Sequence, residues 1–213
     1  MLDVSRHWFT KEEVMRFIDE IAAYKFNIFH WHLTDDQGWR LQSHTYPRLQ
    51  EIGSKRAFRV GDWWTYEPQQ DGEEATYGGY YTKEEIRQVI AYAAQRNIAI
   101  MPEVDVPGHS QATLVCYPEL ACLNAPQKVT LGNKFYGIEE NSLCAGSDAT
   151  YEFLEKIFRN RPGFQLLPVP VEFHELGEIV AVIDGLRFRC GPRIMGEEGV
   201  PSALRRDYPG KGA

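Results

Sequence analysis

Apolar residues recur at helical spacing near the start of the chain and then give way to a short apolar run. Val14, Ile18 and Ile21 lie three or four residues apart, which places them on one face of an α-helix. The pattern predicts a helix over about 11–24. The run "NIFHWHL" over 27–33 is short, apolar and aromatic, which is typical of a buried strand.

The same order of signals appears a second time along the chain. Thr10 with Glu13, and Thr82 with Glu85, both have the spacing of a capping box at a helix start. Each pair is followed by apolar residues at helical spacing, and after the second helix comes the apolar run "IAIMPEVD" over 98–105. We therefore predict a second helix followed by a second strand, and both predicted strands end in acidic residues.

Two further elements extend this alternation of strands and helices. The stretch "SDATYEFLEKIF" predicts a helix capped by Asp148 or Thr150, and "MLDVS" at the start predicts a strand. Alternation of this kind indicates parallel strands joined by crossover helices. No GxGxxG turn supports a doubly wound sheet. We predict an α/β fold of the (β/α)8 TIM-barrel type, of which about the first half, about four β/α units, is present.

The segments between and after these elements are less regular. Residues 36–81 are rich in Tyr, Trp, Gly and Pro without strong periodicity, which in a barrel predicts a β-to-α loop on the active face. Residues 158–213 contain short apolar runs but no helix with recognisable caps. We interpret 1–213 as one partial barrel domain in which 1–157 carries the regular pattern.

Composition and charge narrow the function classes. The chain has 213 residues, of which 43% are hydrophobic, and a net charge of -7, so it can bury a core and is a poor match for nucleic acid or an anionic membrane surface. No window approaches the apolar length of a membrane span, and "MLDVSRHWF" lacks the features of a signal peptide. The four cysteines show no CxxC spacing, so a disulfide and the cellular compartment both stay open.

The stretch "HWHLTDDQGWRL" carries the first candidate site. His30 and His32 are two apart on a predicted strand, point to the same side and could share a metal, which indicates a metal-dependent hydrolase as one alternative. No further histidine-rich ligand set follows at later strand ends. Asp35 beside Trp39 instead suits a sugar pocket, in which acids accept hydroxyl hydrogen bonds and aromatic faces stack.

The stretch "PEVDVPGH" carries the second candidate site, with Glu103, Asp105 and His109 around a Pro-Gly turn. A carboxylate near an imidazole can fix its tautomer and raise its basicity, as a general acid or base requires. The same residues could simply cap the following helix. The position at a strand end that matches the first site favours chemistry.

Four stretches in the same order carry a resemblance to a known family: "MLDVSRHWFTKEEV", "KFNIFHWHLTDDQGWRL", "GGYYTKEEIRQVIAYAAQRNIAIMPEVDVPGHSQA" and "LCAGSDATYEFLEKI". Together they resemble the catalytic barrel of the family 20 glycoside hydrolases, the β-N-acetylhexosaminidases, over residues 1 to about 157. The resemblance implies no cofactor and no metal. It implies removal of terminal, non-reducing β-linked N-acetylglucosamine or N-acetylgalactosamine by a substrate-assisted retaining mechanism.

The resemblance also assigns roles to individual residues. In the family the 2-acetamido oxygen of the sugar attacks the anomeric carbon, an aspartate polarises that acetamide, and the adjacent glutamate is the general acid. By resemblance, Asp35 supports the substrate pocket, and Asp105 with His109 forms the relay that tunes the acid pair. We expect His32 and Trp39 to contribute to substrate binding.

The family's acid pair lies in a motif His, any residue, Gly, Gly, Asp, Glu, which is absent from this sequence. The nearest stretch, "FHELGEIVAVIDG", places Glu178 at the aspartate position and Ile179 at the general-acid position. Isoleucine cannot donate a proton, so a non-catalytic, sugar-binding remnant is the second alternative. A change of reading frame after about residue 158 is a further hypothesis. As partners we expect an N-acetylhexosamine-containing glycan, no nucleic acid, no membrane, and a homo-oligomer that covers open sheet edges.

Overall fold

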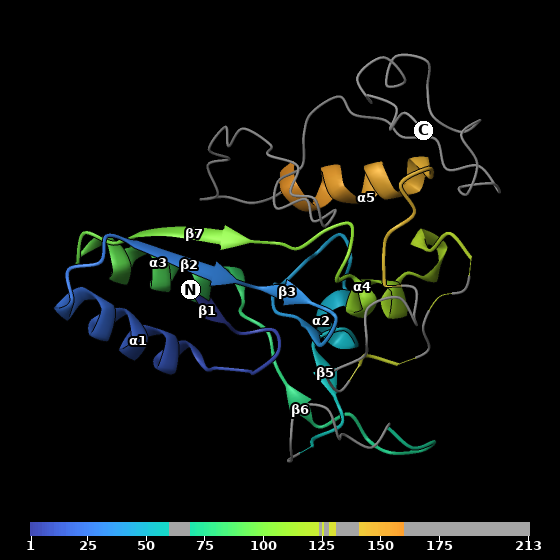
Figure 1. Ribbon diagram of the computed structural model, residues 1–213, viewed down its shortest axis with the longest axis horizontal. Helices are drawn as coiled ribbons and strands as arrows, with labels where there is room; N and C mark the ends of the chain where they lie inside the picture. The colour runs from blue at the N-terminus through green and yellow to red at the C-terminus, as the bar shows by residue number, and fades with distance from the viewer. Residues whose placement is uncertain (60–68, 124, 126–127, 131–140, 160–213) are drawn as a thin grey trace, which may run out of the picture.

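The computed structural model describes residues 1–59, 69–123, 125, 128–130 and 141–159, and the following description refers to these residues. Within them the chain forms a small parallel sheet with helices packed against it and a cap of short elements at one end (Figure 1).

The sheet has three parallel strands in the order β1, β2, β7. They are β1 (Leu2–Asp3), β2 (Ile28–His32) and β7 (Ala99–Glu103). The predicted strands over 27–33 and 98–105 are confirmed to within two residues at each end. In the register, His32 lies beside Asp3 on one side and beside Glu103 on the other. The carboxyl ends of the three strands therefore lie side by side.

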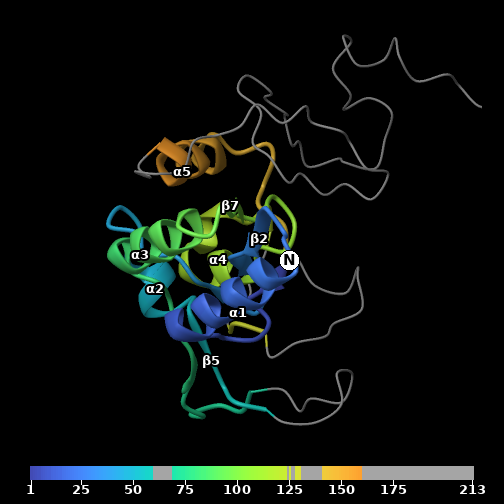
Figure 2. The same cartoon turned by 90° about the vertical axis from the view of Figure 1, so that its left-hand side faces the viewer.

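Two helices connect these strands and lie next to each other against one face of the sheet (Figures 1 and 2). They are α1 (Lys11–Ala23) and α3 (Lys83–Ala94). Both begin with the capping boxes predicted from the sequence, in which the threonine hydroxyl accepts the N–H of the glutamate three residues on. Apolar residues on each helix are buried toward the sheet, including Val14 and Ile18 on α1 and Val89 on α3.

Side chains alternate between the two faces of β2. Phe29 and Trp31 are buried in the core. Ile28, His30 and His32 occupy the opposite face, where Ile28 is 56% exposed in the part of the chain that the structure describes. The polar residues at the strand ends thus lie on the face that α1 and α3 leave uncovered.

The segment between β2 and α3 contains four short strands and one helical turn. The strand β3 (Thr34–Asp35) pairs with β4 (Gly38–Trp39), and β5 (Lys55–Arg56) pairs with β6 (Tyr77–Gly78), with α2 (Arg48–Glu51) between the two pairs. The sequence predicted one loop here. Such two-residue strands carry no periodicity of their own, which is why the pattern did not indicate them.

One buried arginine holds this segment against the start of the sheet. The Arg40 guanidinium donates hydrogen bonds to the carbonyls of Val4 at 2.9 Å, Ser5 at 2.6 Å and Gly79 at 3.1 Å, and also to the Ser54 carbonyl. Arg40 is fully buried. The four carbonyls come from three separate parts of the chain, so Arg40 replaces the regular hydrogen bonds that these short strands lack.

The last described part contains α4 (Gln111–Cys116), the 3-10 turn η1 (Pro118–Leu120) and α5 (Asp148–Arg159). The helix predicted after "SD" is confirmed, but it begins at Asp148, so the predicted caps Asp148 and Thr150 lie within its first turn. A disulfide joins Cys122 to Cys144. Among the described helices, none combines the length and the apolar character needed to cross a bilayer.

The α/β class is therefore confirmed. The described residues contain two strand–helix–strand crossovers, between β1 and β2 and between β2 and β7. A half barrel of about four units remains a prediction, and so does the division of 1–213 at residue 157.

Candidate functional site

Polar side chains from all three parallel strands gather at their carboxyl ends. Asp3, His32 and Glu103 are neighbours in the register of the sheet. The segments that follow these strands add Arg6, Asp35 of β3, Asp105 and His109, which lie in or beside the same cluster. Parallel strands bring residues that are far apart in sequence to one edge, which is why the cluster forms.

Asp35 lies at the centre of the cluster and is almost fully buried. Its carboxylate accepts hydrogen bonds from His32 Nε2 at 2.9 Å, from His109 Nδ1 at 3.1 Å and from the Asp36 backbone N–H at 2.7 Å. Arg6 adds an ion pair at 2.7 Å. Burial alone would raise the pKa of Asp35, but these donors outweigh it and hold the pKa below its usual value. Asp35 is therefore a carboxylate at neutral pH.

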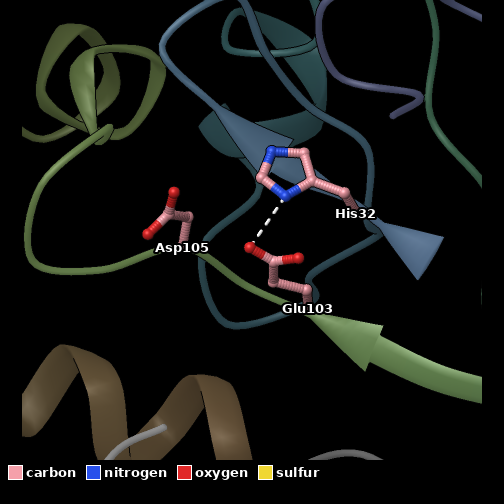
Figure 3. A group of neighbouring side chains, drawn as sticks. All are labelled: His32, Glu103 and Asp105. Carbon is pink, nitrogen blue, oxygen red and sulfur yellow. Dashed lines mark ion pairs between the residues drawn. The ribbon is translucent and has the colours of Figure 1, made fainter. Parts of the chain in front are cut away.

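His32 bridges two carboxylates. Its Nδ1 lies 2.9 Å from Glu103 Oε1, and its Nε2 lies 2.9 Å from Asp35 Oδ2. Figure 3 shows the first of these contacts, between the ends of two neighbouring strands. Burial lowers the pKa of His32, but the two carboxylates raise it to about 10. Glu103 also contacts His30 through its second oxygen.

His109 lies in the loop after β7, in the left-handed backbone region with φ of 50°. This conformation turns the chain back so that Nδ1 faces Asp35, with Asp36 Oδ2 at 3.7 Å. The hydrogen bond to Asp35 raises the pKa of His109 to about 9, against the effect of burial. Asp36 is itself held by the Gln111 N–H at 3.0 Å and by Asn141 at 3.0 Å.

Asp105 differs from the other acids of the cluster. Its backbone N–H donates to Thr34 Oγ1 at 3.0 Å. Its carboxylate lies near His32 and Glu103 but is joined to neither (Figure 3). Burial raises the pKa of Asp105 to about 7, with the charge of His109 acting in the opposite direction. The Asp105 carboxyl group is therefore about half ionised at pH 7, and no cation among the described residues contacts it directly. A carboxyl group with such a raised pKa, at the edge of a charged cluster, is typical of a functional site.

Replacing Asp105 with asparagine should make the folded chain more stable at pH 8. Because the folded-state pKa is raised, the ionised form costs stability, and this cost develops as pH rises from about 4 to 7. We expect a gain of about 1–2 kcal/mol at pH 8, reduced from the full linkage value by contact with water. Urea unfolding at pH 4 and pH 8 measures it. An equal effect at both pH values would contradict the assigned ionisation.

The structure brings together His32, Asp35, Asp105 and His109, four of the site residues predicted from the sequence. The predicted pairing of Asp105 with His109 is wrong in its partner, because His109 Nδ1 faces Asp35 and Asp105 influences the ring through its charge. Glu178 lies outside the described residues. Trp39 is a core residue, since it is 1% exposed, donates its indole N–H to the Leu41 carbonyl at 2.7 Å and packs near Phe153. A tryptophan that follows acids in a sequence can either stack on a sugar or pack in the core. Here the pairing of β3 with β4 directs the Trp39 indole into the core, so the predicted contact of Trp39 with substrate is not supported.

Arg6 was not predicted from the sequence. It ion-pairs with both Asp3 and Asp35 at 2.7 Å. Arg6 comes three residues after Asp3, the acid that ends β1. The other two strands of the sheet are also followed by charged residues, and this shared pattern could have indicated Arg6 as part of the site.

Two groups of side chains in the described part of the chain are close enough to share a cation, with all donor atoms within 4.8 Å. They are His32 with Glu103 and Asp105, and Asp35 with Asp36 and His109. His30, the predicted partner of His32 in a metal site, belongs to neither group. Both ring nitrogens of His32 already face carboxylates, so His32 can offer a lone pair to a metal only after losing a proton and one of these contacts.

Comparisons with known proteins agree on one family. Residues 1–162 match the model of "Glycosyl hydrolase family 20, catalytic domain". The chain is similar to a β-hexosaminidase of Porphyromonas gingivalis, with 39% identity over 157 residues that cover 74% of this chain and 18% of that protein. It is also 44% identical over 155 residues to a β-hexosaminidase of Vibrio furnissii, covering 73% of this chain and 24% of the relative.

Solved structures give the same result. The family 20 β-N-acetylhexosaminidase of Streptomyces coelicolor superposes with a TM-score of 0.61 and 39% identity, over 74% of this chain and 28% of that one. A mutant β-hexosaminidase of Streptomyces plicatus, in complex with its product GlcNAc, has a TM-score of 0.61 and 41% identity over the same shares. The chain thus spans less than a third of the length of these relatives.

Proposed function

The chain belongs to glycosyl hydrolase family 20, and from this premise we propose that its site serves the hydrolysis of terminal β-linked N-acetylhexosamine from glycans. The observation that supports the proposal most strongly is the Asp35–His109 pair beside Asp105, at the carboxyl ends of the parallel strands. This is the edge of an α/β fold at which ligands bind.

The proposed reaction is substrate-assisted. The acetamide oxygen of the sugar forms a bond to the anomeric carbon while the bond to the departing oxygen breaks and that oxygen takes a proton from a general acid. Water then opens the oxazolinium ion, and its proton returns to the same acid. In this sequence Ile179 aligns with the position of that acid, so water would have to supply and take back the proton, which makes turnover slow. Asp35 holds His109 by Nδ1, which fixes the ring so that it can stabilise charge that develops during the reaction.

A direct assay tests this proposal. The full chain is incubated with a chromogenic N-acetyl-β-glucosaminide and, as a control, with the corresponding β-glucoside that lacks the acetamide. We expect hydrolysis of the first substrate only, because the acetamide is the nucleophile. We also expect the rate to be about a hundredfold or more below that of a relative with an intact acid pair, since an ungapped alignment of the sequence with the family motif places Ile179 at the general-acid position.

Two variants locate the activity. His109→Asn should lower the rate on the N-acetylglucosaminide by about tenfold to a hundredfold, whereas Asp19→Asn on the exposed side of α1 should leave it unchanged. Equal rates on both substrates, or insensitivity to His109→Asn, would contradict the proposed site.

The second candidate function is sugar binding without turnover. It is favoured by the same isoleucine, which cannot protonate a departing oxygen. Saturable binding of N-acetylglucosamine by calorimetry, in a chain that hydrolyses neither substrate, would support this candidate over the enzyme.

A further inference from the structure

We propose that His32 is a fixed imidazolium cation that positions Asp35 and limits how strongly Asp35 holds the proton of His109. His32 would then be a positioning residue, since it acts on the reacting groups through Asp35. The effect of His32 on catalysis rests on the proposed function, whereas the charge state of His32 does not.

The geometry leaves one protonation state for the His32 ring. Each ring nitrogen lies 2.9 Å from a carboxylate oxygen, one of Glu103 and one of Asp35. A neutral imidazole has a lone pair on one nitrogen, which would face the lone pairs of an oxygen at that distance. Only the doubly protonated ring donates to both, and the ring is buried at 4% exposure, away from bulk water.

A proton on one of the carboxylates is not a good alternative. Asp35 already accepts from the His109 ring and the Asp36 N–H and pairs with Arg6, so its oxygens are saturated with donors. Glu103 contacts His30 with its other oxygen, and its pKa is lowered below the usual value, since contacts with His32 and His30 outweigh burial. Both acids therefore stay ionised, and the proton stays on His32.

The charges that face His32 come from every neighbouring element. Asp35 on β3 and Glu103 on β7 touch it, Asp3 lies beside it on β1, and Asp105 lies at the edge of the same group. The cations around these acids are Arg6, His109 and, when protonated, His30. The buried acids thus need the positive charge of His32 for balance.

This arrangement has a consequence for His109. The Asp35 carboxylate is shared between His32, Arg6 and His109. Without His32, the charge of Asp35 would act on fewer cations, and the repulsion between the imidazolium rings of His32 and His109 would be removed. The pKa of His109 should therefore be lower with His32 present than without it, so that His109 can release its proton more readily.

Nitrogen NMR of the full chain tests the charge state first. The chain has six histidines, so labelled imidazole signals can be assigned by substituting each in turn. We expect His32 to show two protonated ring nitrogens from pH 5 to pH 9 without titrating. A midpoint below about pH 8, or a neutral tautomer at pH 8, would overturn the proposal. Glu103→Gln should lower the midpoint of His32 by at least about one unit, because an adjacent anion is lost.

The action on His109 is tested with His32→Gln, which keeps a polar but uncharged side chain at this position. We expect the titration midpoint of His109 to rise by about half a unit or more, as Coulomb repulsion is removed. The control His44→Gln, at an exposed residue, should leave it unchanged. If His32 only filled space, Asp35 would loosen and the His109 midpoint would stay or fall, and either result would overturn the proposal.

These readouts separate the proposal from the function it rests on. The NMR titrations require no turnover, so a chain that hydrolyses nothing can still show a permanent imidazolium at His32. Should His32→Gln fail to fold, the titration of the unmodified chain and of Glu103→Gln still decides the charge state.

Discussion

Arg40→Ala is expected to lower the free energy of unfolding by about 3–5 kcal/mol. The fully buried guanidinium donates to four backbone carbonyls from three parts of the chain. Alanine would leave these carbonyls buried without donors and would open a cavity beside Gly38, whose missing side chain makes room for the guanidinium.

A positive charge at position 40 is not sufficient to make these four hydrogen bonds. Burial and the nearby Arg56 lower the pKa of Arg40 to about 10, so it stays charged at neutral pH. Arg40→Lys keeps the charge but has no planar fork, so it should recover only a part of the loss.

Urea unfolding followed by circular dichroism measures both variants, with Arg87→Ala on the exposed side of α3 as the matched control. A loss for Arg40→Ala no larger than for Arg87→Ala would show that the loop segment is held in some other way.

Asp35→Asn is expected to cost about 3–5 kcal/mol at pH 7, because it removes the shared anion of a buried charge cluster. Arg6, His32 and His109 all contact this carboxylate. An asparagine amide offers one acceptor oxygen and places a donor against the remaining rings. The exposed Asp19→Asn, which also removes a hydrogen-bonded carboxylate, is the control and should have a much smaller effect.

The stabilisation that the Asp35 cluster provides depends on pH, and its direction follows from the pKa shifts of Asp35, His32 and His109. Asp35 has a lowered folded-state pKa, so its contribution is present above about pH 4 and is lost as pH falls further. His32 and His109 have raised folded-state pKa values of about 10 and about 9. Their contribution is complete below about pH 6.5 and is lost as pH rises through those values.

Asp35, His32 and His109 should therefore stabilise the unmodified chain fully between about pH 4 and 6.5 and less on either side, while the separate cost of ionising Asp105 grows between about pH 4 and 7. In Asp35→Asn both changes should be smaller, because the rings no longer share that anion. Unfolding curves at intervals from pH 3 to pH 10 measure the profile. An unchanged alkaline decline would mean that Asp35 does not determine the two histidine pKa values.

Local patterns were sufficient to predict the helices and the main strands. Thr10 with Glu13, and Thr82 with Glu85, fix the helix starts through contacts within one turn. The convergence of Asp35 and His109 could also be predicted, because carboxyl ends of parallel strands meet at one edge.

Other features depend on contacts that no local pattern encodes. The partners of Arg40 are as distant as Val4 and Gly79, and an arginine followed by an apolar residue looks like ordinary surface. Trp39 lies beside acids in sequence but packs near Phe153 of α5. Its place in the core is decided by an element from a much later part of the chain.

The alignment of Asp3, His32 and Glu103 across the sheet also bears on how the chain avoids mispairing. A slip of β2 by one position would exchange its two faces, so that Trp31 or Leu33 would stand between Glu103 and Asp35. Glu103 and Asp35 would then lose the cation that they share while an indole or a leucine left the interior. The same imidazole that balances the cluster thus also penalises an alignment in which the central strand is shifted by one residue.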